Sequence, residues 1–384
     1  MKKNIFRNKN KTTIILLTTT NWSEPPRMRH EMAYQLSRFY NVVFFQIYSQ
    51  RGYKRNEFEI NDSLLIKKKG ISFIGINRLF FYFPSIQKLY NRYLTSRIKI
   101  FVKNLSSKNI ILLSFQYNFP EVFDLPCFDL KIYFCNDDFV SQYRNISKFK
   151  TEIFRGFQRS ILLKSNLVFT VSEPLMRLLI KEGARNVKII ESGHSFDLKI
   201  SKNSSYFRDS KYVRVCYLGF LTDAIEIDWF LHILKEELIY LTVIGPCNFN
   251  FILSRLSQFQ NFNYIPILTG EMLQLELLAK DVLVMPYRSK EDNNLTTVPS
   301  KLFQYLAVGK PIVSSKMKNL IKLPDKFIYM ANNHESFLNS ILQAFDEDSI
   351  DLKNSRIDFA QSNTWDKRGN YLHNEIANSI TQPS

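Results

Sequence analysis

The chain has 384 residues, of which 45% are apolar and 23% charged, and its 52 Lys and Arg against 35 Asp and Glu give a net charge of +17. This balance is typical of a folded globular protein and excludes a disordered or fibrous chain. The length predicts about two domains. No apolar run approaches the roughly 18 residues of a membrane-spanning helix, and the basic start lacks the long apolar run and cleavage site of a signal peptide. We therefore expect a cytoplasmic protein.

Basic residues concentrate in the N-terminal part, where residues 1–100 contain 19 Lys and Arg against 5 Asp and Glu. The run Lys67-Lys68-Lys69 and the aromatic segment 79–84 are typical of a surface that docks on an anionic membrane. A solvated basic face beside an ordinary core segment explains the same residues. We find no helix-turn-helix, zinc-finger or RNA-recognition signature, so we expect no nucleic-acid partner. The four cysteines lack the spacing of a zinc site, so we expect no structural metal.

Short β-branched or aromatic runs alternate with helical patterns from the start of the chain, which predicts βαβ units around a parallel sheet. The fold class is therefore α/β. In the first half we expect strands at residues 12–17, 42–47, 110–113, 131–134, 167–171 and 187–191, and helices at 154–163 and 174–182.

A second α/β series follows a polar stretch at 201–210, which we interpret as an interdomain linker. Here we expect strands at 213–217, 241–244 and 282–285, and helices at 227–238, 273–279, 300–307 and 335–345. The sequence thus predicts an N-terminal domain over 1–200, a C-terminal domain over 211–362, and a helical tail over 363–384 that packs at the domain junction.

Ligands in open α/β sheets bind beyond the carboxyl ends of the strands, so the loops that follow strands are the candidate sites. Gly219-Phe220 follows the first strand of the second domain, Gly245-Pro246 the second, and Tyr287 a later one. A glycine without Cβ lets a backbone approach a bulky ligand. A simple tight turn explains each glycine equally well.

The segment 299–311 is the most informative, because it predicts a helix that begins near Pro299 and ends at Gly309. Ser300 and Lys301 stand in its first turn, where free N–H groups, the helix dipole and an ammonium group suit a phosphate or pyrophosphate. Gln304, one turn further, can hydrogen-bond vicinal hydroxyls.

Together with segments 166–172 and 187–197 and with Gly270, this segment resembles glycosyltransferases of the GT-B fold, specifically the family 4 type that builds bacterial cell-surface polysaccharides. The resemblance implies two Rossmann-like domains facing across a cleft and transfer of a sugar from a nucleoside diphosphate. It implies no metal ion and no other cofactor. Many members carry Glu at the positions of Thr296 and Gln304, and a basic phosphate-binding pair follows their first C-terminal strand. Here Lys301 would replace that charge and stabilise the leaving diphosphate.

The resemblance also assigns acceptor binding to the N-terminal domain. Asp137 and Asp138 follow the strand at 131–134 and would supply a general base or bind sugar hydroxyls, although a helix cap explains them too. An anionic or lipid-diphosphate acceptor would contact residues after the first strand and near the predicted cleft, namely Trp22, Arg27, Arg29, His30 and His194. A structural role in packing explains His30 and His194 as well.

Three functions fit these features. The first is a glycosyltransferase, peripheral at the inner face of the membrane, that acts on a glycan or lipid-linked acceptor of the cell envelope. The second is a nucleotide-sugar epimerase of the same fold, which needs no acceptor. The third is a carbohydrate- or nucleotide-binding homologue without activity, which the missing carboxylate at Thr296 would explain.

Overall fold

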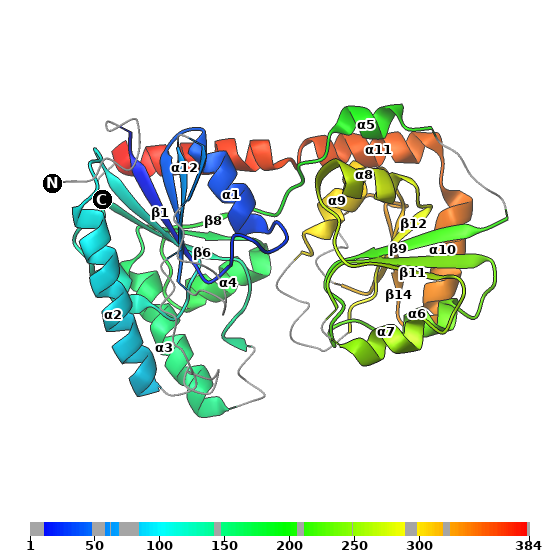
Figure 1. The fold of residues 1–384 in the computed structure, drawn as a ribbon, viewed down its shortest axis with the longest axis horizontal. Helices are drawn as coiled ribbons and strands as arrows, with labels where there is room; N and C mark the ends of the chain where they lie inside the picture. Colours follow the sequence, from blue (N-terminus) through cyan, green and yellow to red (C-terminus); the bar gives the residue numbers. More distant parts are fainter. Residues whose placement is uncertain are drawn as a thin grey trace. The chain divides into compact units, whose positions relative to one another are not determined.

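The computed structural model describes residues 11–47, 58–61, 63–68, 84–141, 147–205, 211–247, 249–288, 298–317 and 323–381. The chain forms two compact units, of which one comprises residues 1–191 and 368–384 and the other residues 192–367. Each unit has its own β-sheet, as Figure 1 shows. The α/β fold class and the two Rossmann-like domains predicted from the sequence are confirmed.

The N-terminal unit is built on an eight-stranded sheet of order β3-β4-β2-β1-β5-β6-β7-β8, in which only β3 pairs antiparallel to its neighbour. β1 and β2 are buried along their whole length, as expected of central parallel strands covered on both faces. The strands are β1 (Thr13–Thr18), β2 (Asn41–Gln46), β3 (Phe58–Asn61), β4 (Leu64–Lys68), β5 (Ile110–Ser114), β6 (Leu130–Cys135), β7 (Leu167–Thr170) and β8 (Val187–Ile189). The described helices are α1 (Met28–Ser37), α2 (Pro84–Lys103), α3 (Lys148–Lys164) and α4 (Glu173–Lys181), with a 3-10 turn at Pro120–Asp124.

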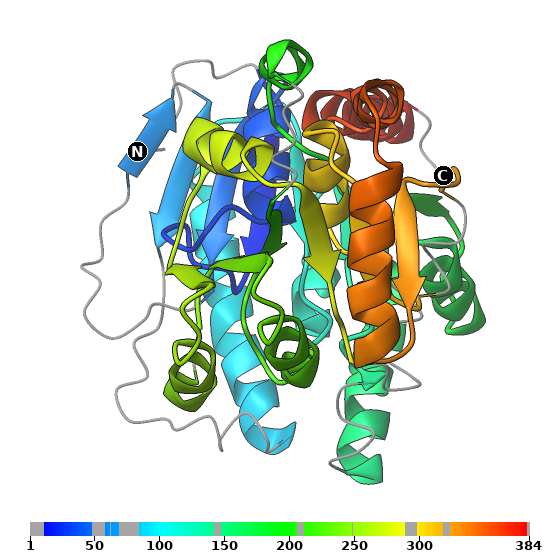
Figure 2. The same cartoon turned by 90° about the vertical axis from the view of Figure 1, so that its right-hand side faces the viewer.

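The C-terminal unit is built on a six-stranded parallel sheet of order β11-β10-β9-β12-β13-β14, seen from another side in Figure 2. Side chains of β9 alternate between its two faces, so that Val215 and Tyr217 join one apolar cluster and Cys216 the other. The strands are β9 (Val213–Leu218), β10 (Ile239–Ile244), β11 (Phe262–Ile265), β12 (Val282–Met285), β13 (Ile312–Ser315) and β14 (Ile328–Ala331). The helices are α5 (Leu198–Asn203), α6 (Ile227–Ile233), α7 (Asn250–Leu256), α8 (Gly270–Leu278), α9 (Lys301–Ala307), α10 (His334–Glu347) and α11 (Ile350–Gln361).

Each sheet has one point at which the chain reverses the direction in which it adds strands. In the N-terminal unit this switch point lies between β1 and β5, and in the C-terminal unit between β9 and β12. The loops that leave the carboxyl ends of two such strands turn to opposite faces of the sheet and leave a crevice between them, which is where open α/β sheets bind ligands. The two switch points are therefore the first places to search for a site.

The observed division of the chain differs from the predicted one around residue 200. Helix α5 occupies the start of the segment interpreted as a linker, with Asp197 accepting a hydrogen bond from the Lys199 amide at 2.8 Å. Ser201 is fully buried and accepts a hydrogen bond from the Gln274 side chain at 2.9 Å. These contacts attach the segment to the C-terminal unit.

Strands β3 and β4 and helix α2 were not anticipated. Lys67 and Lys68, interpreted as part of a basic docking run, belong to β4 and pair with Phe45 and Gln46 of β2. Lys69 and the aromatic segment 79–83 lie outside the described residues.

The C-terminal tail forms helix α12 (Trp365–Thr381), as expected from the sequence. Its first residues belong to the C-terminal unit and the rest to the N-terminal unit. In the N-terminal unit, the His373 ring stacks on Phe39 at a centroid distance of 4.0 Å and hydrogen-bonds the Tyr40 hydroxyl at 2.9 Å. A Cβ on Gly369 would lie 2.5 Å from the Gln35 Cβ, so the absence of a side chain lets α12 approach α1 closely.

Candidate active site

Two glycine turns meet at the switch point of the C-terminal unit. Gly219 follows β9 and Gly245 follows the adjacent β10, with φ angles of +137° and +136°. A Cβ on Gly245 would lie 2.3 Å from the Gly219 carbonyl oxygen, and a Cβ on Gly219 would lie 2.6 Å from the Lys301 Nζ. Both positions therefore require glycine for their backbone conformation and for the space that neighbouring groups occupy. The group closest to the Gly245 turn is thus the Gly219 backbone, and the group closest to the Gly219 turn is the Lys301 ammonium.

Lys301 is the first residue of α9, and its ammonium group lies beside the turn after β9. Its Nζ is 4.0 Å from the centroid of the Tyr217 ring and 5.1 Å from that of Tyr287, within the range of cation–π attraction. The residue is only 9% exposed, and burial lowers the pKa of its ammonium group to about 7. No ion pair or hydrogen bond joins this Nζ to another described residue. A buried ammonium held by aromatic faces instead of a carboxylate retains its capacity to neutralise an anion.

Tyr305 fixes helix α9 against the ends of two strands. Its hydroxyl accepts a hydrogen bond from the Leu218 amide at 2.8 Å and donates one to the Val284 carbonyl at 3.3 Å. Leu218 ends β9 and Val284 lies in β12, so this fully buried side chain holds Lys301 at the switch point itself. Neither Tyr217 nor Tyr305 was predicted as a site residue, because buried aromatics in a strand or helix are typical of an ordinary core.

The other predicted donor-binding residues lie along the same edge of the sheet. Helix α9 begins at Lys301, with Ser300 at its N-cap, and the Pro299 carbonyl accepts a hydrogen bond from the Leu302 amide at 3.0 Å. Gln304 is partly exposed one turn after Lys301, on the same face of the helix. Phe220 is 36% exposed and Pro246 directly follows Gly245, whereas Thr296 lies outside the described residues.

In the N-terminal unit, Arg29, Asn136 and Asp137 form a polar group near the ends of β5 and β6. Arg29 is 9% exposed, its Nη2 donates to the Asn136 Oδ1 at 3.1 Å, and its guanidinium lies 5.2 Å from the Phe115 ring centroid. The buried Arg29 Nε has no hydrogen-bond partner among the described residues. Phe115 follows β5 and Asn136 follows β6, so the group stands beside the β1/β5 switch point.

Asp137 is the titratable group of this cluster. Its pKa is raised to about 6, chiefly because the carboxyl is buried; a hydrogen bond from the Asp138 amide and the charge of Arg29 lower the pKa, and the charge of Asp138 raises it. A carboxylate with this pKa is ionised at neutral pH and basic enough to take a proton from a hydroxyl. The pair Arg29 and Asp137 can thus hold an anionic or hydroxylated ligand.

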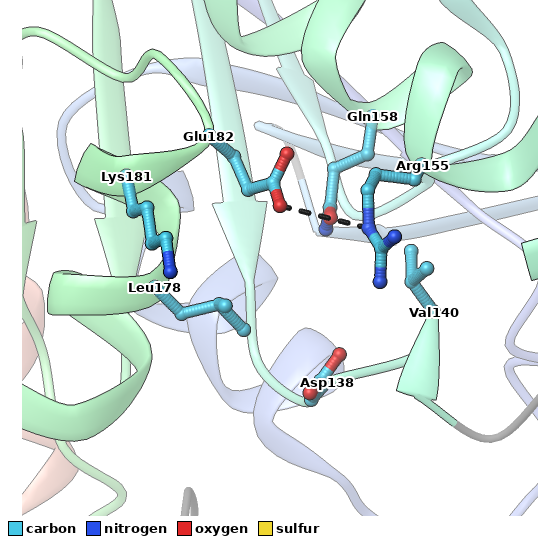
Figure 3. A pocket seen from close by; sticks show the side chains of 7 residues that line it. All are labelled: Asp138, Val140, Arg155, Gln158, Leu178, Lys181 and Glu182. Carbon is cyan, nitrogen blue, oxygen red and sulfur yellow. Dashed lines mark ion pairs between the residues drawn. The ribbon is translucent and has the colours of Figure 1, made fainter. Parts of the chain in front are cut away.

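Asp138 has a different role from its neighbour. Its Oδ1 accepts a hydrogen bond from the Ser141 amide at 3.1 Å, which closes a turn after β6. It also lies at one end of a cavity of about 270 Å³ between α3 and α4, shown in Figure 3. An ion pair between Arg155 and Glu182 crosses this cavity. The remaining lining residues are Val140, Gln158, Leu178 and Lys181.

Trp22 and His30, predicted to bind the acceptor, are used in packing. The His30 Nε2 hydrogen-bonds the Asn21 carbonyl at 3.2 Å and its Nδ1 accepts from the Arg27 amide at 3.1 Å, so both ring nitrogens are engaged. Trp22 lies with its ring centroid 5.0 Å from that of His30 and 4.8 Å from that of Phe44. Arg27 forms an ion pair with Glu24 at 3.0 Å.

His194 is likewise structural and belongs to the C-terminal unit instead of the predicted N-terminal domain. It is 1% exposed, its Nε2 hydrogen-bonds the Ala360 carbonyl at 3.0 Å, and its Nδ1 accepts from the Phe196 amide at 3.2 Å. Neither ring nitrogen is left for an acceptor.

Comparison with known proteins identifies the fold. No family model matches the chain. A sucrose-phosphate synthase from Thermosynechococcus elongatus superposes with a TM-score of 0.77 at 11% identity, covering 97% of this chain and 100% of that one. An α,α-trehalose-phosphate synthase (UDP-forming) from Burkholderia xenovorans, in complex with glucose-6-phosphate, gives a TM-score of 0.67 at 10% identity, covering 97% and 100%. The chain has the GT-B fold.

One curated protein with a similar sequence is also named as a glycosyltransferase. A protein of Bacillus subtilis (strain 168) named as a teichuronic acid biosynthesis glycosyltransferase, TuaH, is 23% identical over 232 residues. The match covers 55% of this chain and 56% of TuaH, so the chain spans about half the length of this curated relative. Among the described helices, none is both long and apolar enough to cross a membrane.

Proposed function

We propose that this protein is a glycosyltransferase that moves a sugar from a nucleoside-diphosphate sugar to a hydroxyl of a cell-envelope glycan or lipid-linked acceptor. The buried ammonium of Lys301 at the β9/β12 switch point carries the proposal. Burial has removed most of the water around the Lys301 ammonium. The two phosphate groups of a bound diphosphate would take the place of that water, and the ion pair between ammonium and phosphate would be strong because it is shielded from solvent. The name of TuaH and the substrates in the names of the structural neighbours support the same reaction.

In this mechanism the C-terminal unit binds the donor and stabilises the leaving group. As the bond from the sugar to the diphosphate breaks, negative charge grows on the departing oxygen, and the protonated Lys301 offsets it. Gln304 hydrogen-bonds ribose hydroxyls. Because Lys301 supplies the positive charge, we propose that transfer needs no metal ion. The resemblance to family 4 remains a prediction.

The N-terminal unit binds the acceptor in this proposal. Asp137 accepts a hydrogen bond from the attacking hydroxyl and takes up its proton, while Arg29 contributes positive charge to an anionic group of the acceptor. An acceptor of the cell envelope fits a cytoplasmic protein at the inner face of the membrane, with an anionic membrane surface as a partner.

Titration calorimetry with a panel of nucleoside diphosphates tests the donor site. We expect one diphosphate to bind, and Lys301→Met, which keeps the length and removes the charge, to weaken its affinity about 100-fold. Lys310→Met is the matched control, because Lys310 is a partly buried lysine whose pKa is also lowered by burial but which follows the other end of α9. An unchanged affinity of Lys301→Met would show that the phosphate site is misplaced.

Protein stability shows whether the variant folds. Because burial lowers the pKa of Lys301 to about 7, its charged form costs stability below that pH, and the cost disappears as the pH rises through 7 towards 10. Lys301→Met should therefore be more stable than the parent at pH 6, by about 3 kcal/mol. A folded, more stable variant that no longer binds diphosphate is the expected result.

A product assay separates transfer from epimerisation. A transferase releases diphosphate from a nucleotide sugar only when an acceptor hydroxyl is present. An epimerase would change the sugar of the donor with no acceptor added, and this outcome would favour the alternative function.

A further inference from the structure

The outer face of helix α2 has no role in the sugar transfer proposed above. On its inner face, Leu94 and Ile98 are buried, and Tyr90 donates a hydrogen bond to the Ile47 carbonyl at 3.4 Å. On the outer face, Leu89 is 64% and Tyr93 48% exposed. Leu89 and Tyr93 are four residues apart, so they lie together one turn apart on the helix surface.

Positive charge accompanies these apolar side chains. Lys88 and Arg92 are exposed beside Leu89 and Tyr93, and helix α2 as a whole has five basic residues and no acidic one. No ion pair joins Lys88 or Arg92 to another described residue. An amphipathic helix with exposed apolar and basic side chains side by side is typical of a surface that lies on an anionic lipid headgroup layer.

The amino-terminal end of helix α3 repeats this combination. Phe149 is 71% exposed, the largest exposed fraction among the large apolar side chains of the described residues, and it lies between Lys148 and Lys150. In both views the amino-terminal ends of α2 and α3 extend toward the same end of the N-terminal unit (Figures 1 and 2). Two separate helices of the N-terminal unit thus present an aromatic or aliphatic side chain flanked by cations.

We propose that these residues form a docking surface for anionic membranes. The α2–α3 docking surface consists of Lys88, Leu89, Arg92, Tyr93, Lys148, Phe149 and Lys150. Basic groups attract anionic headgroups, and the three apolar side chains enter the headgroup–acyl boundary, where burial of apolar surface adds to the electrostatic attraction. Helix α3 follows β6, whose carboxyl end carries Asn136 and Asp137, so docking would bring this edge of the sheet towards the lipid surface.

Vesicle cosedimentation of the full chain tests the docking surface independently of sugar transfer. We expect binding to vesicles of phosphatidylcholine with phosphatidylglycerol, little binding to phosphatidylcholine alone, and weaker binding at high salt. The double variants Arg92→Glu/Tyr93→Ser and Lys148→Glu/Phe149→Ser should each lower vesicle affinity at least about tenfold. The matched control Lys235→Glu/Leu238→Ser makes the same kinds of change at exposed residues of the C-terminal unit and should stay within about twofold of the parent.

A fluorescence measurement distinguishes insertion from simple charge attraction. Phe149→Trp places a reporter at the most exposed apolar position, and its emission should shift to shorter wavelength when anionic vesicles are added, with the parent chain as the blank. The proposal is overturned if the parent does not bind anionic vesicles or binds soluble dextran sulfate instead. It is equally overturned if both test variants bind like the control, or if the reporter shows no shift.

Discussion

The two switch points of this protein carry different balances of charge. At β9/β12, Lys301 stands among tyrosine rings with no described carboxylate bonded to it, whereas near β1/β5 the cation Arg29 is accompanied by Asp137. An isolated buried cation suits an anion, because nothing inside the protein competes for it. A cation beside a carboxylate of raised pKa suits hydroxyls and proton transfer. The same sheet architecture thus offers two different chemistries, one in each unit.

The largest expected effect comes from Asp137. Asp137→Asn keeps the shape and removes the basic oxygen, so we expect sugar transfer to fall by about 10²–10⁴-fold while nucleotide binding is unchanged. Asp138→Asn is the control, since that carboxylate closes a turn with Ser141, and its variant should lose stability more than activity. If Asp137→Asn lowers the rate of sugar transfer by less than about fivefold, Asp137 is not the proton acceptor, and the two switch points do not differ in chemistry as proposed.

The same variant has a signature in stability that does not depend on activity. A raised pKa means that ionised Asp137 costs stability, and this cost grows as the pH rises from about 4 through 6. Asp137→Asn should therefore raise the free energy of unfolding at pH 8 by about 2 kcal/mol and leave it unchanged near pH 3. Chemical denaturation at the two pH values measures this difference.

The glycine turns give the next largest effect. Gly245→Ala should destabilise the protein by more than about 3 kcal/mol, because the new Cβ would overlap the Gly219 carbonyl and the backbone has a positive φ. Gly270→Ala tests the φ contribution alone, since Gly270 has φ +60° but open space around its Cβ position, and it should cost about 1 kcal/mol. Equal losses of melting temperature in the two variants would refute the close approach of the turns.

The pH dependence of kcat/KM should report both switch points at once. The proposed mechanism requires Asp137 ionised and Lys301 protonated, so the profile of the free enzyme should be bell-shaped, with limbs at about 6 and about 7. Asp137→Asn should abolish the acid limb, and Lys301→Arg should move the alkaline limb out of the measured range. A profile that is flat from pH 5 to 9 would contradict both assignments.

The smallest expected effect concerns the residue that positions helix α9. Tyr305→Phe removes the hydrogen bond that the hydroxyl accepts from the Leu218 amide and the one that it donates to the Val284 carbonyl, which should lower stability by about 1–2 kcal/mol. We expect diphosphate affinity to fall about threefold, because Lys301 loses part of its alignment. Calorimetric titration of this variant distinguishes a positioning role from mere packing, which would leave affinity unchanged.

Sequence patterns predicted much of the proposed donor site but less of the proposed acceptor site. Gly219, Gly245, Tyr287 and Lys301 follow strands or begin a helix, and the structure brings them together at one edge of the sheet. At the start of helix α1, by contrast, Arg29 and His30 are adjacent in sequence yet have different roles. Neighbouring positions on a helix point about 100° apart, so only the packed structure shows that Arg29 reaches Asn136 while His30 hydrogen-bonds its own loop.

The sequence by itself determined the α/β class, the number of units and most strands, because these follow from apolar periodicity and from glycines and prolines that act locally. Only the tertiary structure decided the order of the strands. Strand order depends on pairing between distant segments, and it places β12 beside β9, so that Tyr217, Lys301 and Tyr287 meet around one buried charge. Pairing between distant strands produces no periodic pattern in the sequence. The cluster around Lys301 therefore forms only when the sheet has formed, and the sequence alone could not show it.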